Sequence, residues 1–309
     1  MSFNPSRPGQ DNLTGDARAL FLKVATPEVL QQFLKKTVFR SKTRIRTISS
    51  GKSAQHIVSG TGTADYHTPG STLVGTPIGW SEKVISVDDE LVADRFIASV
   101  DEAIAHYDIR GVHTREMGDA LAQKFDQAVA RCISLAARSA ATITGGSGGG
   151  EVEDAQFLTS GDDLVAGIFE AAEIFDEKNV PEDERYVAVL PEQYYNLILA
   201  AKVTNQDYTE GVNGGVNTGR IVKIAGLQVV KTNNVPRTAV ATGPAAYQGD
   251  FTNVAGLCWH PSAVGTTMLQ DMSMSVDWIP QNRGYLMQAA YLLGHGTLRP
   301  EAAIELVLS

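Results

Sequence analysis

Two short motifs in the chain have residue types suited to catalysis or phosphate binding. The first is the run Gly145-Gly-Ser147-Gly-Gly149, which matches the G-x-S-x-G nucleophile elbow of serine hydrolases. That elbow needs a strand before the serine and a helix after it, so that the hydroxyl is held strained and exposed. Here the run follows a segment with helical periodicity. We therefore predict a flexible glycine linker, and a hydrolase with Ser147 as nucleophile remains only an alternative.

The second motif, Ser50-Gly51-Lys52-Ser53, has the letters that end a phosphate-binding P-loop. The first glycine of G-x-x-x-x-G-K-S would fall at Arg46, so the glycine-rich backbone cradle is missing. We predict instead that Lys52 packs at a contact between subunits.

Histidines and cysteines give no metal-binding pattern. Cys132 and Cys258 fit no C-x-x-C spacing, and their apolar neighbours predict small buried side chains. No pair of histidines has the H-x-x-x-H or H-E-x-x-H spacing that binds zinc, so we expect isolated structural histidines. The sequence predicts no metal, no cofactor and no enzymatic activity. The six histidines are His56, His67, His106, His113, His260 and His295.

Charge is distributed unevenly along the chain. Residues 18–52 hold nine basic residues and one acid, a net charge of +8, whereas the whole chain carries -9. Such a basic segment on an acidic body fits a contact with an acidic neighbour, or a surface that faces a polyanion inside an assembly. A solvated charge run and a dedicated nucleic-acid-binding arm are the alternatives. The candidate site residues are Lys35, Lys36, Arg40, Lys42, Arg44, Arg46 and Lys52.

Composition bounds the class of protein. The 309 residues are 43% hydrophobic and 20% charged, which is ordinary for a globular protein. No apolar run approaches the roughly 18 residues needed to span a membrane, and residues 1–10 lack the apolar core of a signal peptide. We expect synthesis in a cytoplasm and no membrane partner.

The first half of the chain combines extended segments with one long helix. Residues 1–17 have the composition of a disordered segment, and residues 57–85 predict a long polar β-hairpin whose return strand is 83–87. Ser99 and Glu102 form a capping box for a short helix over 100–107. The strongest helical periodicity runs over 114–140. Its apolar face is Met117, Leu121, Phe125, Ala128, Val129, Cys132, Leu135 and Ala136, and Arg115, Asp119, Lys124, Asp126, Arg131 and Arg138 occupy other faces.

The second half predicts an α+β arrangement. A helix begins at Asp162 or Asp163, and Pro191 opens another that runs to Lys202. The first of these helices has one apolar face, formed by Leu164, Val165, Ile168, Phe169, Ala172 and Phe175. Strands are predicted at 185–190, 221–224, 227–231, 256–260, 264–269, 273–278, 287–293 and 303–308.

Five local strings resemble the major capsid proteins of T7-like short-tailed phages, in the same order along the chain. They are Ile48–Gln55, Glu82–Asp88, His106–Arg110, Ser262–Thr266 and Gly294–Ala303. The order of basic arm, hairpin, long helix and α+β insertion resembles the HK97-like capsid fold. The resemblance implies an N-terminal arm (1–55), an E-loop hairpin (56–90), a P-domain with a spine helix (91–150), an A-domain (151–262) and C-terminal strands (263–309).

The same resemblance implies a virion capsid protein that assembles as pentamers and hexamers into an icosahedral T=7 shell around double-stranded DNA. Its implied partners are copies of itself, a scaffolding protein and a portal protein, without a covalent cross-link. An encapsulin-like nanocompartment shell, which has the same fold, is the alternative. We expect removal of residues 1–50 to abolish regular shells.

Overall fold

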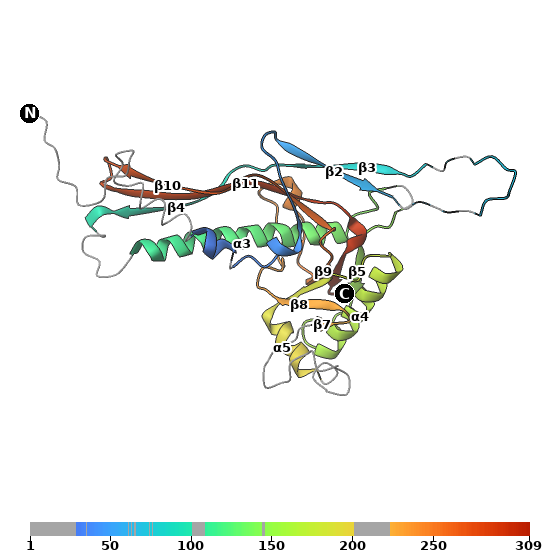
Figure 1. Cartoon of the computed structure of the whole chain (residues 1–309). Helices are drawn as coiled ribbons and strands as arrows, with labels where there is room; N and C mark the ends of the chain where they lie inside the picture. The colour runs from blue at the N-terminus through green and yellow to red at the C-terminus, as the bar shows by residue number, and fades with distance from the viewer. Residues whose placement is uncertain are drawn as a thin grey trace, which may run out of the picture. The chain divides into compact units, whose positions relative to one another are not determined.

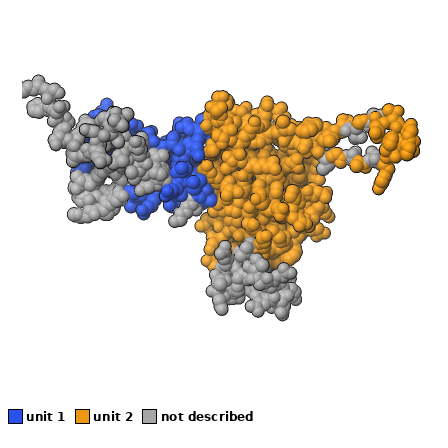
Figure 2. Space-filling view, in the orientation of Figure 1, with its two compact units in different colours: residues 1–37, 89–124, 270–292 blue, residues 38–88, 125–269, 293–309 orange. Residues whose placement is uncertain are grey.

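The computed structural model describes a large part of the chain and divides it into two compact units (Figure 2). The described residues are 29–34, 36–60, 62, 64, 66–73, 75, 77–100, 109–143, 146–200 and 223–309. Unit 1 comprises residues 1–37, 89–124 and 270–292, and unit 2 comprises 38–88, 125–269 and 293–309. The predicted disordered segment, most of the capped helix at 100–107 and Lys35 lie outside the described residues.

The longest helix is α3, Ile109–Ala137, whose 29 residues span roughly 43 Å. It confirms the long helix predicted over 114–140. The predicted apolar face is mostly buried, with Met117, Phe125 and Val129 at 1% exposure or less. Asp126 differs from the expectation. The periodicity placed it away from the apolar face of the helix, but its side chain is buried, with 1% exposure.

In unit 1, β4 (Leu91–Ala98) pairs antiparallel with the first part of β11 (Gly284–Thr297). The ring of Phe33 lies 6.0 Å from that of Tyr291, and the Tyr291 hydroxyl donates to the backbone carbonyl of Leu121 on α3. A strand, a helix and the segment before the first strand therefore share one apolar core.

Unit 2 contains a six-stranded sheet in the order β5-β12-β9-β6-β8-β7 (Figure 1). Its central strand β6 pairs antiparallel with β9 and parallel with β8, and all four of its residues are buried. The run Tyr-Val-Ala-Val suits a strand covered on both faces. The strands are β5 (Gly150–Glu153), β6 (Tyr186–Val189), β7 (Lys223–Ile224), β8 (Leu227–Lys231), β9 (Val254–Trp259) and β12 (Ala303–Val307).

Two helices complete this part of unit 2: α4, Gly161–Glu177, and α5, Pro191–Leu199. The Ser160 hydroxyl caps α4 by accepting from the Asp163 amide, so the cap precedes the predicted first residue. The predicted apolar face of α4 is correct except at Phe169, which is 56% exposed. Short 3-10 turns lie at η1 (Arg40–Lys42), η2 (Ala245–Tyr247) and η3 (Pro300–Ala302).

A second sheet has the strand order β1-β10-β11-β4, in which β1 is Arg44–Thr47 and β10 is Val264–Ile279. β1 runs parallel to the first part of β10, with Arg44 opposite Gly265. Two separate strands were predicted over 264–278, and the structure has one strand of 16 residues there. The polar interruption at Gln270 and Asp271 faces solvent, so it does not break the strand.

The end of the glycine run after α3 is closely packed at Gly149, which corrects the expectation of a flexible linker there. The Gly149 amide donates to the backbone carbonyl of Ser139 at 2.9 Å. A Cβ at Gly149 would overlap the carbonyl oxygen of Ala137. Glycine is needed here because two backbone segments approach closely, and β5 begins at the next residue.

The predicted domain ranges stay a prediction.

Candidate functional site: the hairpin and the basic segment

The hairpin, residues 53–86, is built from β2 (Ser53–Ser59) and β3 (Trp80–Ser86), which pair antiparallel. Within unit 2 it projects from the six-stranded sheet and its helices (Figure 1). Because side chains alternate along a strand, it has two faces. The inner face buries Ala54, Val58 and Ile85 at 4% exposure each.

The outer face of the hairpin carries three large apolar side chains that are open to solvent, among polar residues. Ile57, Trp80 and Val84 are 74%, 70% and 57% exposed. Toward the tip, Tyr66 and Leu73 are also exposed. The sequence predicted a polar hairpin, so this outer face was missed. The signal was the adjacent pair Ile57-Val58, since neighbouring residues in a strand must lie on opposite faces.

The base of the hairpin is fixed by hydrogen bonds. The Val87 amide donates to the Lys52 carbonyl at 2.7 Å, and the Asp88 amide donates to the Leu293 carbonyl at 3.2 Å. The Tyr247 hydroxyl donates to the Asp88 carboxylate and accepts from the backbone amide of His295. The inner face and base therefore hold the hairpin in one orientation on unit 2.

The basic segment, residues 35–52, is anchored in unit 2 by a buried carboxylate. The backbone amides of Val38 and Phe39 donate to the Asp126 carboxylate at 2.9 and 3.2 Å, and the side-chain amide of Asn234 donates to it at 3.4 Å. Burial raises the pKa of Asp126 to about 6, against the opposing effects of these donors and of the Lys42 ammonium. The carboxyl thus caps two backbone groups at the start of the segment.

Side chains of the basic segment pack on the body as well. Phe39 is fully buried, its ring 5.0 Å from that of Trp259, and the Trp259 indole donates to the Lys42 carbonyl. The Lys42 ammonium donates to the Val38 carbonyl at 2.8 Å and lies 5.5 Å from the Tyr186 ring centroid. Burial lowers the pKa of Lys42, which Asp126 opposes.

The remaining predicted site residues lie nearer the surface. In unit 1, the Lys36 ammonium is 3.7 Å from the Asp119 carboxylate, and both side chains are exposed. In unit 2, Arg40 is half-buried, while Arg44, Arg46 and Lys52 are exposed. The structure brings Arg44 and Arg46 together on β1.

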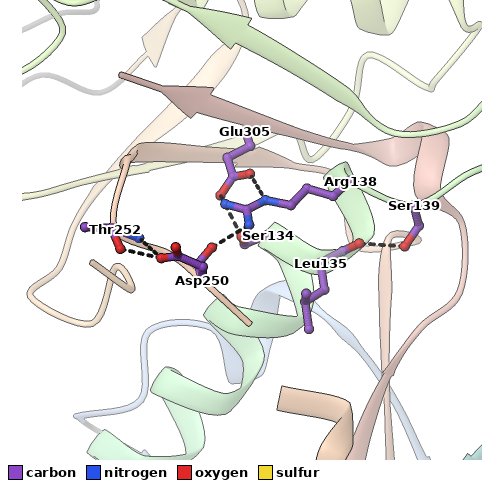
Figure 3. Close-up of polar contacts among 7 residues, drawn as sticks. All are labelled: Ser134, Leu135, Arg138, Ser139, Asp250, Thr252 and Glu305. Atoms are coloured by element: carbon purple, nitrogen blue, oxygen red, sulfur yellow. Dashed lines mark hydrogen bonds and ion pairs between the residues drawn. The ribbon is translucent and has the colours of Figure 1, made fainter. Parts of the chain in front are cut away.

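A polar network joins α3 to the six-stranded sheet of unit 2 (Figure 3). The fully buried Glu305 carboxylate of β12 accepts from the Ser134 hydroxyl at 2.6 Å and from the Arg138 guanidinium at 2.7 and 3.1 Å. Arg138 also donates to the Asp250 carbonyl. Burial raises the pKa of Glu305, whereas Arg138 and Ser134 oppose that rise. The network is structural, and no pattern in the sequence pointed to Glu305.

The two motifs that suggested chemistry lack the required context. Ser147 is exposed between helix α3 and strand β5, the reverse of the strand-then-helix order of the elbow. Lys52 is followed by a strand instead of the helix of a P-loop. The described residues contain no group of three or more histidines, cysteines or acids placed to hold a metal. None of the described helices is long and apolar enough to cross a membrane.

The two thiols are buried as predicted, and two of the six histidines make structural contacts. Cys132 and Cys258 are free, fully buried thiols whose pKa burial raises. The ring Nδ1 atoms of His260 and His295 lie 2.8 and 2.9 Å from the hydroxyls of Ser262 and Thr266.

The long helix α3, the projecting hairpin, the α+β part of unit 2 and the long strands β10 and β11 are the elements of an HK97-like capsid protein. A solved capsid of the cyanophage P-SCSP1u matches with a TM-score of 0.79 and 38% identity, covering 88% of each chain. The mature capsid of bacteriophage PhiM1 matches with a TM-score of 0.73 at 19% identity, covering 88% of this chain and 87% of that chain. A virus-like particle from Pyrococcus furiosus is 12% identical with a TM-score of 0.59, which shows the shared fold alone.

The family described as "Gp10A-like: Major capsid protein" matches residues 56–307, and the chain belongs to it. The major capsid protein of Escherichia phage T7 is 32% identical over 94% of this chain and 92% of its own length. That of Enterobacteria phage T3 is 31% identical over 97% and 94%. The chain is therefore a shell-forming protein of a phage capsid, and the encapsulin alternative is not favoured.

Proposed function

We propose that each copy in the shell lays its hairpin over a neighbouring copy, which covers the apolar outer face. The observation that carries this proposal is the exposure of Ile57, Trp80 and Val84 on a hairpin whose other face is already packed. Burying a large apolar side chain contributes about 1.5–3 kcal/mol. Three such residues supply a contact that is useful in a shell yet reversible during assembly.

The finer features of the shell are proposals from the family resemblance. They are pentamers and hexamers in a T=7 lattice, guidance by a scaffolding protein in the host cytoplasm, a portal at one vertex, and packaged double-stranded DNA. The exposed members of the basic segment suit non-specific contact with a polyanion or an acidic neighbour. We also propose that the chain has no enzymatic activity.

Trp80→Ala tests the hairpin contact. Each subunit would lose about 2 kcal/mol of apolar burial, so we expect the critical concentration for shell assembly to rise about 30-fold. Trp80→Phe is the matched control, because it keeps most of the apolar area, and it should assemble nearly normally. Assembly is measured by light scattering and negative-stain microscopy. Normal assembly of a folded Trp80→Ala chain would contradict the proposal.

Truncation of residues 1–50 tests the role of the N-terminal arm in assembly less specifically than the sequence indicated. It would remove Phe39, which is fully buried against Trp259, and expose the core of unit 2. Loss of shells after that truncation would therefore reflect misfolding as well as loss of the arm. Single substitutions of exposed residues such as Arg44 separate the two effects.

A further inference from the structure

A cavity of about 280 Å³ opens in unit 2 between β1, β2 and the segment that follows β11. Three guanidinium groups line it, those of Arg44, Arg46 and Arg299, together with the imidazole of His56. None of the described residues that line it is acidic. The other lining residues are Gln55, Ile57, Val58, Ser262 and Leu298.

Most of the hydrogen-bond donors of these guanidinium groups are not used by the described chain. Arg46 donates to the Gln55 carbonyl, and Arg299 donates to the Ser59 carbonyl at 3.2 Å. One Arg299 nitrogen lies 3.8 Å from Glu301. Within the described residues, Arg44 and Arg46 form no ion pair. Since each guanidinium has five N–H groups, the cavity offers a surplus of donors.

Two histidines near these guanidinium groups have a lowered pKa, mainly because they are buried. The Nε2 atom of His56 is buried and has no hydrogen-bond partner among the described residues. Burial lowers the pKa of His56, and the charges of Arg46 and Arg44 lower it further. Burial and Arg44 also lower the pKa of His260. An anion in the cavity would reverse the electrostatic part of these shifts.

We propose that this cavity binds one phosphate-type oxyanion, held by Arg44, Arg46 and Arg299. Inorganic phosphate carries more negative charge and more acceptor oxygens than a carboxylate, so it matches three guanidinium groups better. A nucleic-acid phosphodiester carries a single charge on two free oxygens, and it would meet the same guanidinium groups through those two oxygens. The His56 side chain also lines the cavity, so its ring can report on a bound anion. The phosphate group comes either from free inorganic phosphate or from a nucleic-acid phosphodiester, and the experiment below distinguishes the two.

The test follows the histidine resonances of the full-length, unassembled chain by NMR. Inorganic phosphate is titrated against chloride at equal ionic strength. We expect a saturable shift of the His56 resonance with phosphate and a rise of about one unit in its pKa. Arg44→Gln should weaken phosphate binding about 10-fold, because it removes one charge-assisted contact.

Lys52→Gln is the matched control, since it removes the same charge from the same segment but not from the cavity lining. It should change phosphate affinity less than twofold. Absence of a saturable His56 shift would overturn the proposal, as would equal weakening by both substitutions. These outcomes are independent of the hairpin contact, because the chain is measured before assembly.

A short DNA duplex provides the second arm of the experiment. If the duplex competes with phosphate and Arg44→Gln weakens it more than Lys52→Gln does, the ligand is a phosphodiester. If phosphate binds and the duplex does not compete, the ligand is free phosphate. If phosphate fails to bind while Arg44→Gln prevents shell formation, the cavity accepts a carboxylate of another copy and the proposal is wrong.

Discussion

Asp126→Asn is the substitution for which the structure gives the sharpest expectation. The folded chain holds the pKa of Asp126 at about 6, compared with an ordinary value of 3.8. A raised pKa means that the folded state binds the proton more tightly than the unfolded state. The protonated carboxyl therefore favours folding fully below pH 3.8, and that contribution is lost as the pH rises through about 6.

The magnitude follows from the shift of about two pKa units. At 1.36 kcal/mol per unit, ionisation of Asp126 lowers the free energy of unfolding by about 3 kcal/mol between pH 3.5 and pH 7.5. Asparagine does not titrate, and its carbonyl can still accept from the amides of Val38 and Phe39. The variant should gain stability relative to the wild type as the pH rises, by up to about 3 kcal/mol.

Urea unfolding of the unassembled chain at several pH values measures this difference. Comparison with the wild type at each pH cancels the titration of all other carboxyls, which act in both chains. If Asp126→Asn were less stable at pH 7.5 than at pH 4, relative to the wild type, the hydrogen bonds and Lys42 would outweigh burial. Our account of the anchor would then be wrong.

Two further pairs of substitutions test the packing around α3. Arg138→Met should destabilise the chain more than Glu305→Gln does, by about 1–2 kcal/mol in urea unfolding at pH 8. The reason is that Arg138→Met leaves a fully buried carboxylate without its partner, whereas the Arg138 side chain is 31% exposed and can reach water when Glu305 is replaced. Equal losses of stability would show that the two groups share the cost of desolvation equally. Gly149→Ala should lower the free energy of unfolding by at least about 2 kcal/mol through overlap with the helix end, while Gly75→Ala, where a Cβ meets nothing within 4 Å, should leave it unchanged.

The elements that the sequence predicts well are those with strong local periodicity. The repeat of apolar residues over 114–140 predicted α3 to within a few residues, and the apolar run at 185–190 predicted the central strand β6. Pro191 correctly marked the first turn of α5. In each case, the residues within one segment contain the whole signal.

The sequence predictions were wrong where contacts between segments distant in sequence determine burial and packing. Asp126 was assigned to a polar face because it is charged, yet its neighbours one turn away, Ala122 and Ala130, are buried. Burial of that carboxyl is tolerable because segments distant in sequence bring donors to it, chiefly the amides of Val38 and Phe39. The glycine run likewise suggested flexibility by composition, whereas close backbone packing is the reason for glycine at 149.

The way the hairpin is held on unit 2 suits the function of a shell subunit. A two-stranded hairpin alone is marginally stable in water. Here Ala54, Val58 and Ile85 pack on unit 2, and the Tyr247–Asp88 contact fixes the base, so most of the ordering entropy is lost during folding. In the contact that we propose, association with a neighbour then has less entropy to overcome, and three exposed apolar side chains are enough to hold it. Each contact can stay weak individually, because a closed shell repeats it around every subunit.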